Sequence, residues 1–245
     1  LGVLGFFYSY ICLANEDDIS NGDKTLINFS YNQAIARASP AVVNIYSEQV
    51  VGKETQRKTR RFNPIFDNKS NSIKTSLGSG VILSSDGYIL TNQHVIGDIS
   101  LKITVELLDG KKYKAHIIGI DRGTDLAVLK ISNSEAIFPS IEIDNSDKVK
   151  IGDIVLAIGN PYGLGQSVSM GIISATGREF ENPYSSYIQT DASINKGNSG
   201  GALIDTQGRL IGINTLIRSS SGGSEGIGLA IPSTSALEII SDLIQ

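Results

Sequence analysis

The sequence has few of the residues that many functional sites need. One cysteine, Cys12, rules out a disulfide within the chain and a cysteine-ligated zinc site. Only two histidines occur, His94 and His116, so a mechanism that needs an imidazole must use one of them. Charged residues make up 19% of the chain and the net charge is −4, which excludes nucleic-acid binding by bulk electrostatic attraction. We expect no metal and no cofactor.

Long apolar runs are also scarce. Residues 1–14 carry no charge, but they are shorter than the about 20 residues of a membrane-spanning helix. Two interpretations stay open: the core of a signal peptide cleaved near Ala14, or the end of an uncleaved membrane anchor. Both predict export. Residues 15–39 then form a polar tether and a short helix, which begins with a capping-box pattern at Ser30 and ends before Pro40.

The rest of the chain is rich in short strand-like runs separated by turn signals. The dipeptides Asp86-Gly87 and Asp109-Gly110 are typical of hairpins. Two sets of about six strands predict two β-barrels, at about 40–135 and 150–232, joined near 136–150. A final helix is expected over 233–245, with Leu237, Ile240 and Ile244 on one face.

The sharpest local motif surrounds Ser199. Residues 197–201 read GNSGG, which matches the G-x-S-x-G turn of α/β-hydrolases. That fold needs a histidine after the serine, and none follows Ser199. It also needs a helix after the motif, whereas residues 202–204 are strand-like. We therefore exclude the α/β-hydrolase interpretation.

The chain order histidine, aspartate, serine fits a different catalytic triad. His94 follows a predicted strand, and Asp125 stands immediately before an apolar run. His94 would accept the proton of the Ser199 hydroxyl, and Asp125 would orient the imidazole. The turn Gly197–Asn198–Ser199 would bind the oxyanion, mainly through the N–H groups of Gly197 and Ser199. His116 is interpreted as a structural side chain in a strand, among apolar neighbours.

These residues resemble a known family. Three blocks are similar to the catalytic blocks of HtrA-type serine proteases: residues 91–95 (TNQHV), 124–130 (TDLAVLK) and 197–203 (GNSGGAL). The similarity extends over about 40–242. Residues 174–178 (SATGR) and 212–216 (GINTL) resemble most the DegS branch of membrane-anchored periplasmic stress proteases.

The resemblance implies a trypsin-like double barrel and a homotrimer built through N-terminal contacts. Phe29 and Tyr31 are the aromatic residues expected at that interface. It also implies ATP-independent cleavage of misfolded or regulatory proteins in the periplasm, by an enzyme that is either anchored to the inner membrane or secreted. Loops around the active site would regulate it, with Arg178 as the candidate contact residue. Family members carry PDZ domains, and none is expected before Gln245.

The substrate pocket is expected to have apolar walls. The candidates are Ser193, Ile194, Leu216 and Ile217, none of them charged. We therefore expect Val or Ala before the scissile bond rather than Lys or Arg. Two other functions stay open: a holdase-type chaperone with weak proteolysis, and a peptide-binding module with an inactive protease fold. The complete triad argues against the inactive module.

Overall fold

The computed structural model describes residues 30–51, 72–97, 100–133, 135–160, 165–180, 182–195, 197–217 and 225–244. At 50–51, 72–74, 180, 182–185 and 216–217 it describes the backbone only. The chain divides into two units, Leu1–Ser30 and Tyr31–Gln245, and the described helices and strands all belong to the second. The predictions made for residues 1–29, Phe29 included, lie outside the described residues. No helix in the described ranges is long and apolar enough to cross a membrane.

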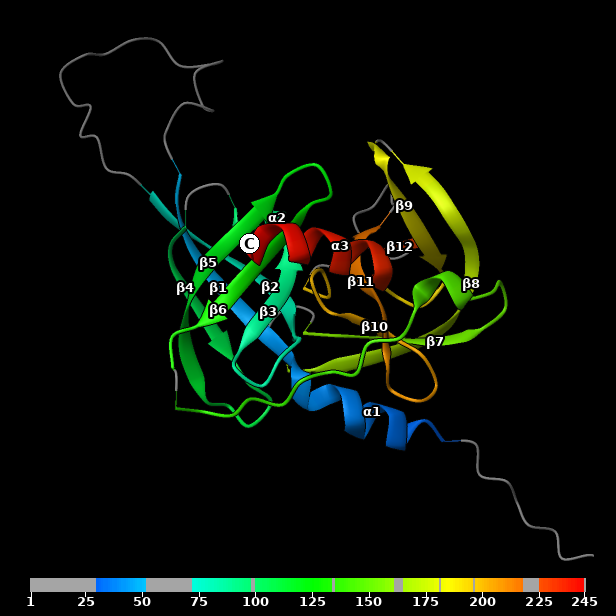
Figure 1. The fold of residues 1–245 in the computed structure, drawn as a ribbon, viewed down its shortest axis with the longest axis horizontal. Helices are drawn as coiled ribbons and strands as arrows, with labels where there is room; N and C mark the ends of the chain where they lie inside the picture. The colour runs from blue at the N-terminus through cyan, green and yellow to red at the C-terminus, as the bar shows by residue number, and fades with distance from the viewer. Residues whose placement is uncertain are drawn as a thin grey trace, which may run out of the picture. The chain divides into compact units, whose positions relative to one another are not determined.

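Strands dominate the second unit, as the sequence predicts (Figure 1). The first six are β1 (Val42–Val51), β2 (Ser72–Ile82), β3 (Tyr88–Asn92), β4 (Ser100–Glu106), β5 (Lys112–Asp121) and β6 (Leu126–Ile131). The next six are β7 (Ile154–Gly159), β8 (Ser167–Phe180), β9 (Asn182–Thr190), β10 (Ala202–Ile204), β11 (Leu210–Ile217) and β12 (Gly228–Pro232). The helical segments are α1 (Asn32–Ala38), η2 (Ser39–Ala41), α2 (Gln93–Ile96), η4 (Ser146–Lys148) and α3 (Ser233–Ile244).

The strands form two closed antiparallel barrels of the same topology. Barrel 1 has the strand order β1-β2-β3-β6-β5-β4, and barrel 2 has the order β10-β11-β12-β9-β8-β7. Written as a ring from β7, the second order repeats the first strand for strand. The double six-stranded barrel predicted from the sequence is confirmed, and the last strand of barrel 1 and the first of barrel 2 lie on either side of the predicted connection at 136–150.

The predicted turns follow from local chemistry. Gly87 and Gly110 have φ of 91° and 83°, values that side chains disfavour and glycine adopts readily, and they stand in the β2–β3 and β4–β5 connections. The predicted start of α1 is less accurate. Tyr31 rather than Ser30 stands at the N-cap, and its side chain makes no capping hydrogen bond.

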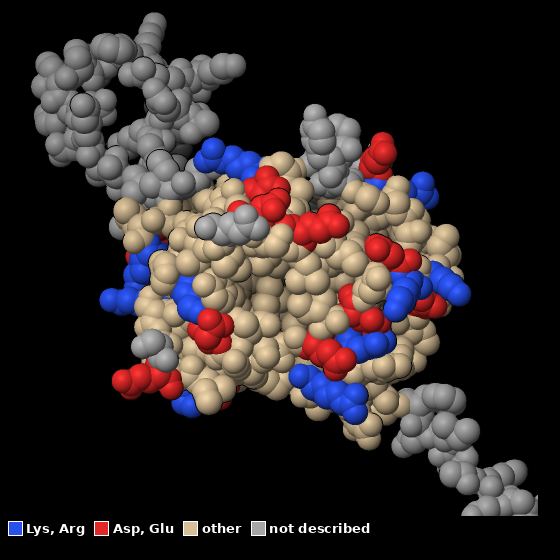
Figure 2. All heavy atoms as spheres, in the orientation of Figure 1, with Lys and Arg blue, Asp and Glu red and all other residues tan. Residues whose placement is uncertain are grey.

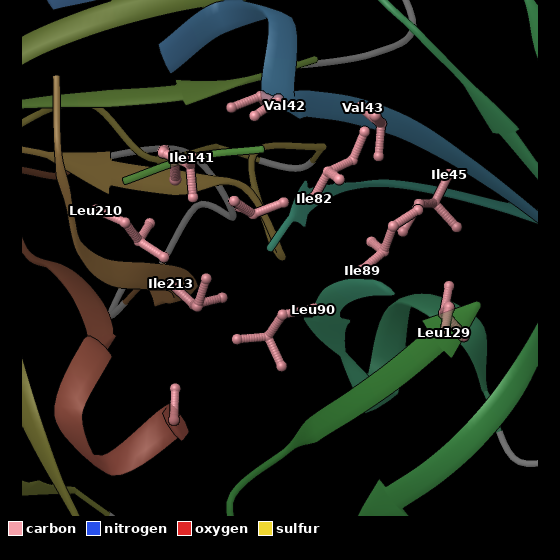
Figure 3. Close-up of a cluster of buried hydrophobic side chains, with 14 of the residues drawn as sticks. Val42, Val43, Ile45, Ile82, Ile89, Leu90, Leu129, Ile141, Leu210 and Ile213 are labelled. Atoms are coloured by element: carbon pink, nitrogen blue, oxygen red, sulfur yellow. The ribbon is translucent and has the colours of Figure 1, made fainter. Parts of the chain in front are cut away.

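One hydrophobic core extends across the boundary between the barrels. The side chains in Figure 3 come from both barrels and from the connection: Val42, Val43, Ile45, Ile82, Ile89, Leu90, Leu129, Ile141, Leu210 and Ile213. A second cluster fills the inside of barrel 2 and includes Val155, Ile173 and Leu203. Because both barrels contribute to the first cluster, neither can shift without exposing apolar surface. A site at their boundary therefore has rigid walls.

Helix α3 crosses both barrels in Figure 1 and covers part of the shared core. Its buried residues include Ala236 and Ile240, whereas Leu237 and Ile244 are each 42% exposed. The predicted apolar face is therefore right at Ile240 and wrong at Leu237 and Ile244, and Ala236 is buried in place of Leu237. The small side chain of Ala236 lets the helix approach the core closely.

The described surface mixes charges of both signs. On the face shown in Figure 2, acidic and basic side chains stand in small neighbouring groups around a largely uncharged centre. This distribution agrees with the modest net charge.

Candidate active site

His94 is positioned by a single helical turn that follows β3. Asn92 ends the strand with an extended backbone, and α2 begins at the next residue. Gly97 ends the turn with φ of 71° and donates its N–H to the Gln93 carbonyl over 2.8 Å. The turn projects His94 outward, so that 43% of its side chain is exposed. An imidazole in this position is open to solvent and to a substrate.

Asp125 stands where the sequence predicts it, immediately before β6. It is the one described non-glycine residue with positive φ, at 60°, a conformation that costs most side chains about 1 kcal/mol or more. Its backbone carbonyl accepts hydrogen bonds from the Gln93 N–H (2.9 Å) and from Asn92 Nδ2 (3.0 Å). These two bonds tie Asp125 to the turn that carries His94.

The Asp125 carboxylate contacts His94 at two points. Oδ2 lies 2.6 Å from His94 Nδ1, and Oδ1 accepts the His94 backbone N–H over 2.9 Å. Because the carboxylate accepts at Nδ1, that nitrogen carries the proton and Nε2 keeps its lone pair. The imidazole is therefore oriented to act as a base through Nε2.

Thr215 of β11 connects this pair to barrel 2. Its hydroxyl donates to Asp125 Oδ2 over 3.2 Å, and the residue is 3% exposed. We did not predict this role from the sequence. The only signal is a polar residue in a mainly apolar strand, and nothing in the chain order indicates a partner 90 positions away.

Ser199 lies in a turn that is tightly packed against barrel 1. Gly200 has φ of 81°, and a Cβ there would lie 2.2 Å from the Ser79 carbonyl oxygen. The Ser199 hydroxyl donates to the Thr215 carbonyl over 3.1 Å, and among the described residues no hydrogen bond joins it to His94. The hydroxyl must leave that carbonyl before it can donate to His94 Nε2.

The three predicted oxyanion residues differ in their backbone contacts. The Asn198 N–H donates to the Asn195 carbonyl over 3.0 Å, so it is already used inside the loop. Gly197 has φ of 103°, a conformation suited to glycine. The carbonyl of Asn198 accepts from the Gly201 N–H over 2.9 Å, which closes the turn around Ser199.

The pocket candidates lie close to one another but differ in exposure. Ser193 is exposed, whereas Ile194 is 1% exposed and belongs to the core of barrel 2. Leu216 and Ile217 pair with Leu229 and Gly228 along the backbone, and only their backbone is described. A Cβ at Gly228 would lie 2.8 Å from Ile194 Cδ1, so Ile194 packs closely beneath this strand.

Two other candidates lie away from the triad. Arg178 is exposed on β8, opposite Tyr187 of β9, and forms no ion pair with a described residue. His116 is exposed on β5 although its sequence neighbours are apolar, and its Nδ1 lies 3.3 Å from Ser132 Oγ. Within the described ranges, no three His, Cys, Asp or Glu side chains are grouped as metal ligands.

Comparison with protein families agrees with this geometry. The family model described as "Trypsin-like peptidase domain" matches residues 78–213, a range that includes the three predicted positions His94, Asp125 and Ser199. This chain belongs to the trypsin-like peptidase family. Its trypsin-like peptidase fold places the strand β10, and no helix, directly after the Ser199 turn, which agrees with the exclusion of an α/β-hydrolase.

Individual relatives narrow the family to HtrA-type serine endoproteases. The serine endoprotease DegS of Escherichia coli strain K12 is 49% identical over 222 residues, which cover 88% of this chain and 58% of DegS. A "probable periplasmic serine protease do/HhoA-like" of Haemophilus influenzae is 49% identical over 69% of this chain and 37% of its own length. This trypsin-like peptidase chain thus spans just over half of the DegS relative.

Solved structures give the same result. A variant of the HtrA-type protease AlgW with decapeptide is 46% identical with a TM-score of 0.79, and the match covers 88% of this chain and 67% of that one. A serine endoprotease from Yersinia pestis is 47% identical with a TM-score of 0.69, over 89% of this chain and 68% of its own. The trypsin-like fold and the HtrA-type resemblance inferred from the sequence are confirmed.

Proposed function

We propose that the chain is the catalytic domain of an ATP-independent serine endopeptidase with Ser199 as nucleophile, His94 as general base and Asp125 as the orienting carboxylate. The observation that carries the proposal is the two-point contact between Asp125 and His94, at 2.6 Å and 2.9 Å. That contact fixes both the tautomer and the orientation of the imidazole. Membership of the trypsin-like peptidase family supports the same roles.

The reaction begins when the Ser199 hydroxyl leaves the Thr215 carbonyl and donates to His94 Nε2. Its oxygen then attacks the substrate carbonyl carbon while Nε2 takes the proton. The N–H groups of Gly197 and Ser199 stabilise the resulting oxyanion, at about 3–4 kcal/mol for each donor. His94 gives the proton to the leaving amine, and a water molecule activated by His94 releases the acyl group in the same way.

The proposed substrate is an unfolded or regulatory protein with a small aliphatic side chain before the scissile bond. Ser193 carries no charge, so a buried Lys or Arg side chain would lack a partner there. Ile194 would form an apolar floor from beneath, with Leu216 and Ile217 as the strand next to it. The test is to digest casein and map the cuts by mass spectrometry. A majority of cuts after Lys or Arg would contradict this pocket.

The proposed setting is the periplasm, with the chain in a homotrimer and its N-terminal segment either anchored to the inner membrane or removed. The names of the Haemophilus influenzae relative and of DegP-like relatives support the compartment.

Tyr31 is half-buried beside the core and, with Phe29, is proposed to contact a neighbouring copy. Arg178 is proposed to bind an active-site loop. Light scattering tests the trimer by comparing residues 28–245 with a chain that begins at Ala41, and a monomer in both would contradict it.

A fluorophosphonate probe and casein test the activity itself. The parent chain should react with the probe at Ser199 and degrade casein without ATP, and Ser199→Ala should do neither while it unfolds at the parent temperature. Casein cleavage by the Ser199→Ala variant would overturn the proposal. If the parent chain prevents aggregation of an unfolded protein but never cleaves it, the holdase alternative holds instead.

A further inference from the structure

Ser79 of β2 is a fully buried serine at the boundary of the barrels. Its hydroxyl donates to the Gly197 carbonyl over 2.7 Å and accepts the Asn160 N–H over 2.9 Å. Its own N–H donates to the Ser199 carbonyl over 2.9 Å, and its carbonyl accepts the Thr91 hydroxyl over 2.7 Å. Every polar group of this residue therefore forms a hydrogen bond. Two of these bonds reach residues 197–200 of barrel 2, which we call the nucleophile turn.

We propose that the Ser79 hydroxyl is a positioning group for the nucleophile turn, whose N–H groups would bind the oxyanion. It acts through the backbone of Gly197 and Ser199 and does not touch the substrate. The inference rests on the proposed function, because it assumes that the N–H groups of this turn stabilise a tetrahedral intermediate.

The hydrogen bonds hold the peptide groups on both sides of the Ser199 N–H. In the Gly197–Asn198 peptide, the carbonyl binds Ser79 Oγ and the N–H binds the Asn195 carbonyl. In the Ser199–Gly200 peptide, the carbonyl binds the Ser79 N–H and the N–H binds the Asn214 carbonyl, at 2.7 Å. The Asn198–Ser199 peptide lies between these two fixed groups, so the direction of the Ser199 N–H is set by its neighbours.

Glycine at 197 makes this restraint necessary. Gly197 has φ of 103°, and glycine adopts several backbone conformations at similar free energy. A side-chain hydrogen bond to the Gly197 carbonyl favours one of them. Donors help catalysis only when they are aimed in advance at the place where charge develops. The Ser79 hydroxyl is the side-chain group that meets this carbonyl in the described structure.

The packing around the Ser79 hydroxyl leaves little space for another group to take its place. A Cβ at Gly159 would lie 2.7 Å from Asn198 Cα and 3.1 Å from Ser79 Oγ. Loss of the hydroxyl would therefore leave the Gly197 carbonyl and the Asn160 N–H buried without a partner. The turn would then populate other conformations, in which the oxyanion donors point elsewhere.

Ser233→Ala is a matched control for Ser79→Ala. Ser233 is 1% exposed, and its hydroxyl donates to the Asp144 carbonyl over 2.6 Å at the start of α3. Both substitutions remove a buried hydroxyl that binds a backbone carbonyl, so both lower stability through the same loss. Only Ser79 contacts the nucleophile turn.

The experiment measures kcat and KM for a peptide substrate, with rates normalised to the folded enzyme by titration with a fluorophosphonate. For Ser79→Ala we expect kcat to fall about 10- to 100-fold, less than the loss of a whole oxyanion donor, with KM within about threefold. Affinity for a peptide boronic acid, which forms a tetrahedral adduct, should fall by a similar factor. Ser233→Ala should keep the parent kcat and affinity. Ser79→Cys, which keeps the size but donates weakly, replaces the alanine variant if that one does not fold.

The outcomes separate this inference from the function on which it rests. An active parent enzyme with an unchanged kcat in folded Ser79→Ala or Ser79→Cys overturns the role of Ser79 and leaves the triad intact. Equal losses in Ser79→Ala and Ser233→Ala would show a general stability effect and also overturn it. A parent chain that neither cleaves peptide nor reacts with the probe overturns the proposed function, and the role of Ser79 with it.

Discussion

The two barrels share one topology but contribute differently to the candidate site. Barrel 1 supplies the proposed acid–base pair, in which Asp125 and His94 are already in contact at 2.6 Å. Barrel 2 supplies the turn with the proposed nucleophile, in which the Ser199 hydroxyl is bound to the Thr215 carbonyl instead of to His94. One half is thus assembled through side chains, and the other mainly through backbone hydrogen bonds.

For the proposed mechanism, this difference indicates which half of the site must rearrange. The proposed base needs no rearrangement, because the carboxylate binds both the imidazole ring and the backbone N–H of His94. The proposed nucleophile must first release one hydrogen bond to a strand carbonyl. A neutral hydrogen bond contributes about 1 kcal/mol net, so the binding of a substrate can supply the free energy that this change requires. Regulation of such a site would therefore act on barrel 2 at lower cost than on barrel 1.

Removal of the base should give the largest effect and test the contribution of barrel 1. His94→Ala leaves Ser199 without a proton acceptor, and we expect kcat to fall about 10⁴-fold or more. His116→Ala is the matched control, because His116 is an exposed histidine of the same barrel whose one side-chain hydrogen bond to a described residue is with Ser132. Its kcat should stay at the parent value. Similar losses in two folded variants would overturn the assignment of the base.

Asp125→Asn should have the next largest effect. Asparagine tolerates the positive φ of 60° at this position, so the fold should persist. Its amide cannot fix the imidazole tautomer as a carboxylate does, and kcat should fall about 10³- to 10⁴-fold. Peptide hydrolysis and a crystal structure of the variant check the two claims. A kcat within tenfold of the parent value would show that the orienting role lies elsewhere.

Much of the architecture of both barrels follows from local sequence signals. The Asp-Gly dipeptides at two hairpins, the apolar runs of the strands and the short motifs around His94, Asp125 and Ser199 can each be recognised within a few residues. The lengths of β1, β2 and β8, which extend well beyond the predicted runs, depend on pairing with other strands. The contact of Thr215 with Asp125 and that of Ser79 with Gly197 join positions 90 and 118 residues apart. Such pairs are set by how the barrels dock, and no local pattern encodes them.

The exposure of His116 follows from regular alternation within β5. Residues 112–116 alternate between exposed and partly buried side chains, and His116 shares the exposed face with Lys112 and Lys114. The register of β5 with β6 shifts between Ile117 and Gly119, so the alternation is interrupted only after His116. A bulge of this kind depends on the partner strand, and the sequence of β5 alone does not reveal it. The burial of Ile194, which is 1% exposed, likewise depends on packing against other strands.

Thr215→Val tests the contact between the barrels and should have a smaller effect. Valine keeps the branched shape in the buried strand but removes the hydroxyl that donates to Asp125 Oδ2 over 3.2 Å. The carboxylate still holds His94 by its other contacts, so we expect kcat to fall about three- to tenfold, as for one hydrogen bond. Thr215→Ser should restore most of the rate. A Thr215→Val variant with parent kcat would show that barrel 1 orients His94 unaided.

The smallest effect should come from Tyr46→Phe, which alters barrel 1 away from the site and leaves activity unchanged. The Tyr46 hydroxyl donates to Glu106 Oε2 over 2.6 Å between β1 and β4. This hydrogen bond is the main cause that lowers the pKa of the Glu106 carboxyl, and it raises the pKa of Tyr46 to about 12. We expect the variant to lose about 1 kcal/mol of unfolding free energy near neutral pH, as for one hydrogen bond.

The pH dependence of that loss is the sharper test. A lowered carboxyl pKa contributes stability that is present above the usual value of about 4.3 and is lost as the pH falls through the lowered value. A raised phenol pKa contributes stability that is present below about 10 and is lost as the pH rises toward 12. The difference in unfolding free energy between parent and Tyr46→Phe, measured in urea, should therefore be largest between these limits and shrink on both sides.

Tyr88→Phe is the control, because the Tyr88 hydroxyl makes no hydrogen bond to a described residue, and the effect of this substitution on stability should not vary with acid pH. A Tyr46→Phe deficit that stays constant down to pH 3 would show that Glu106 is not the partner that matters.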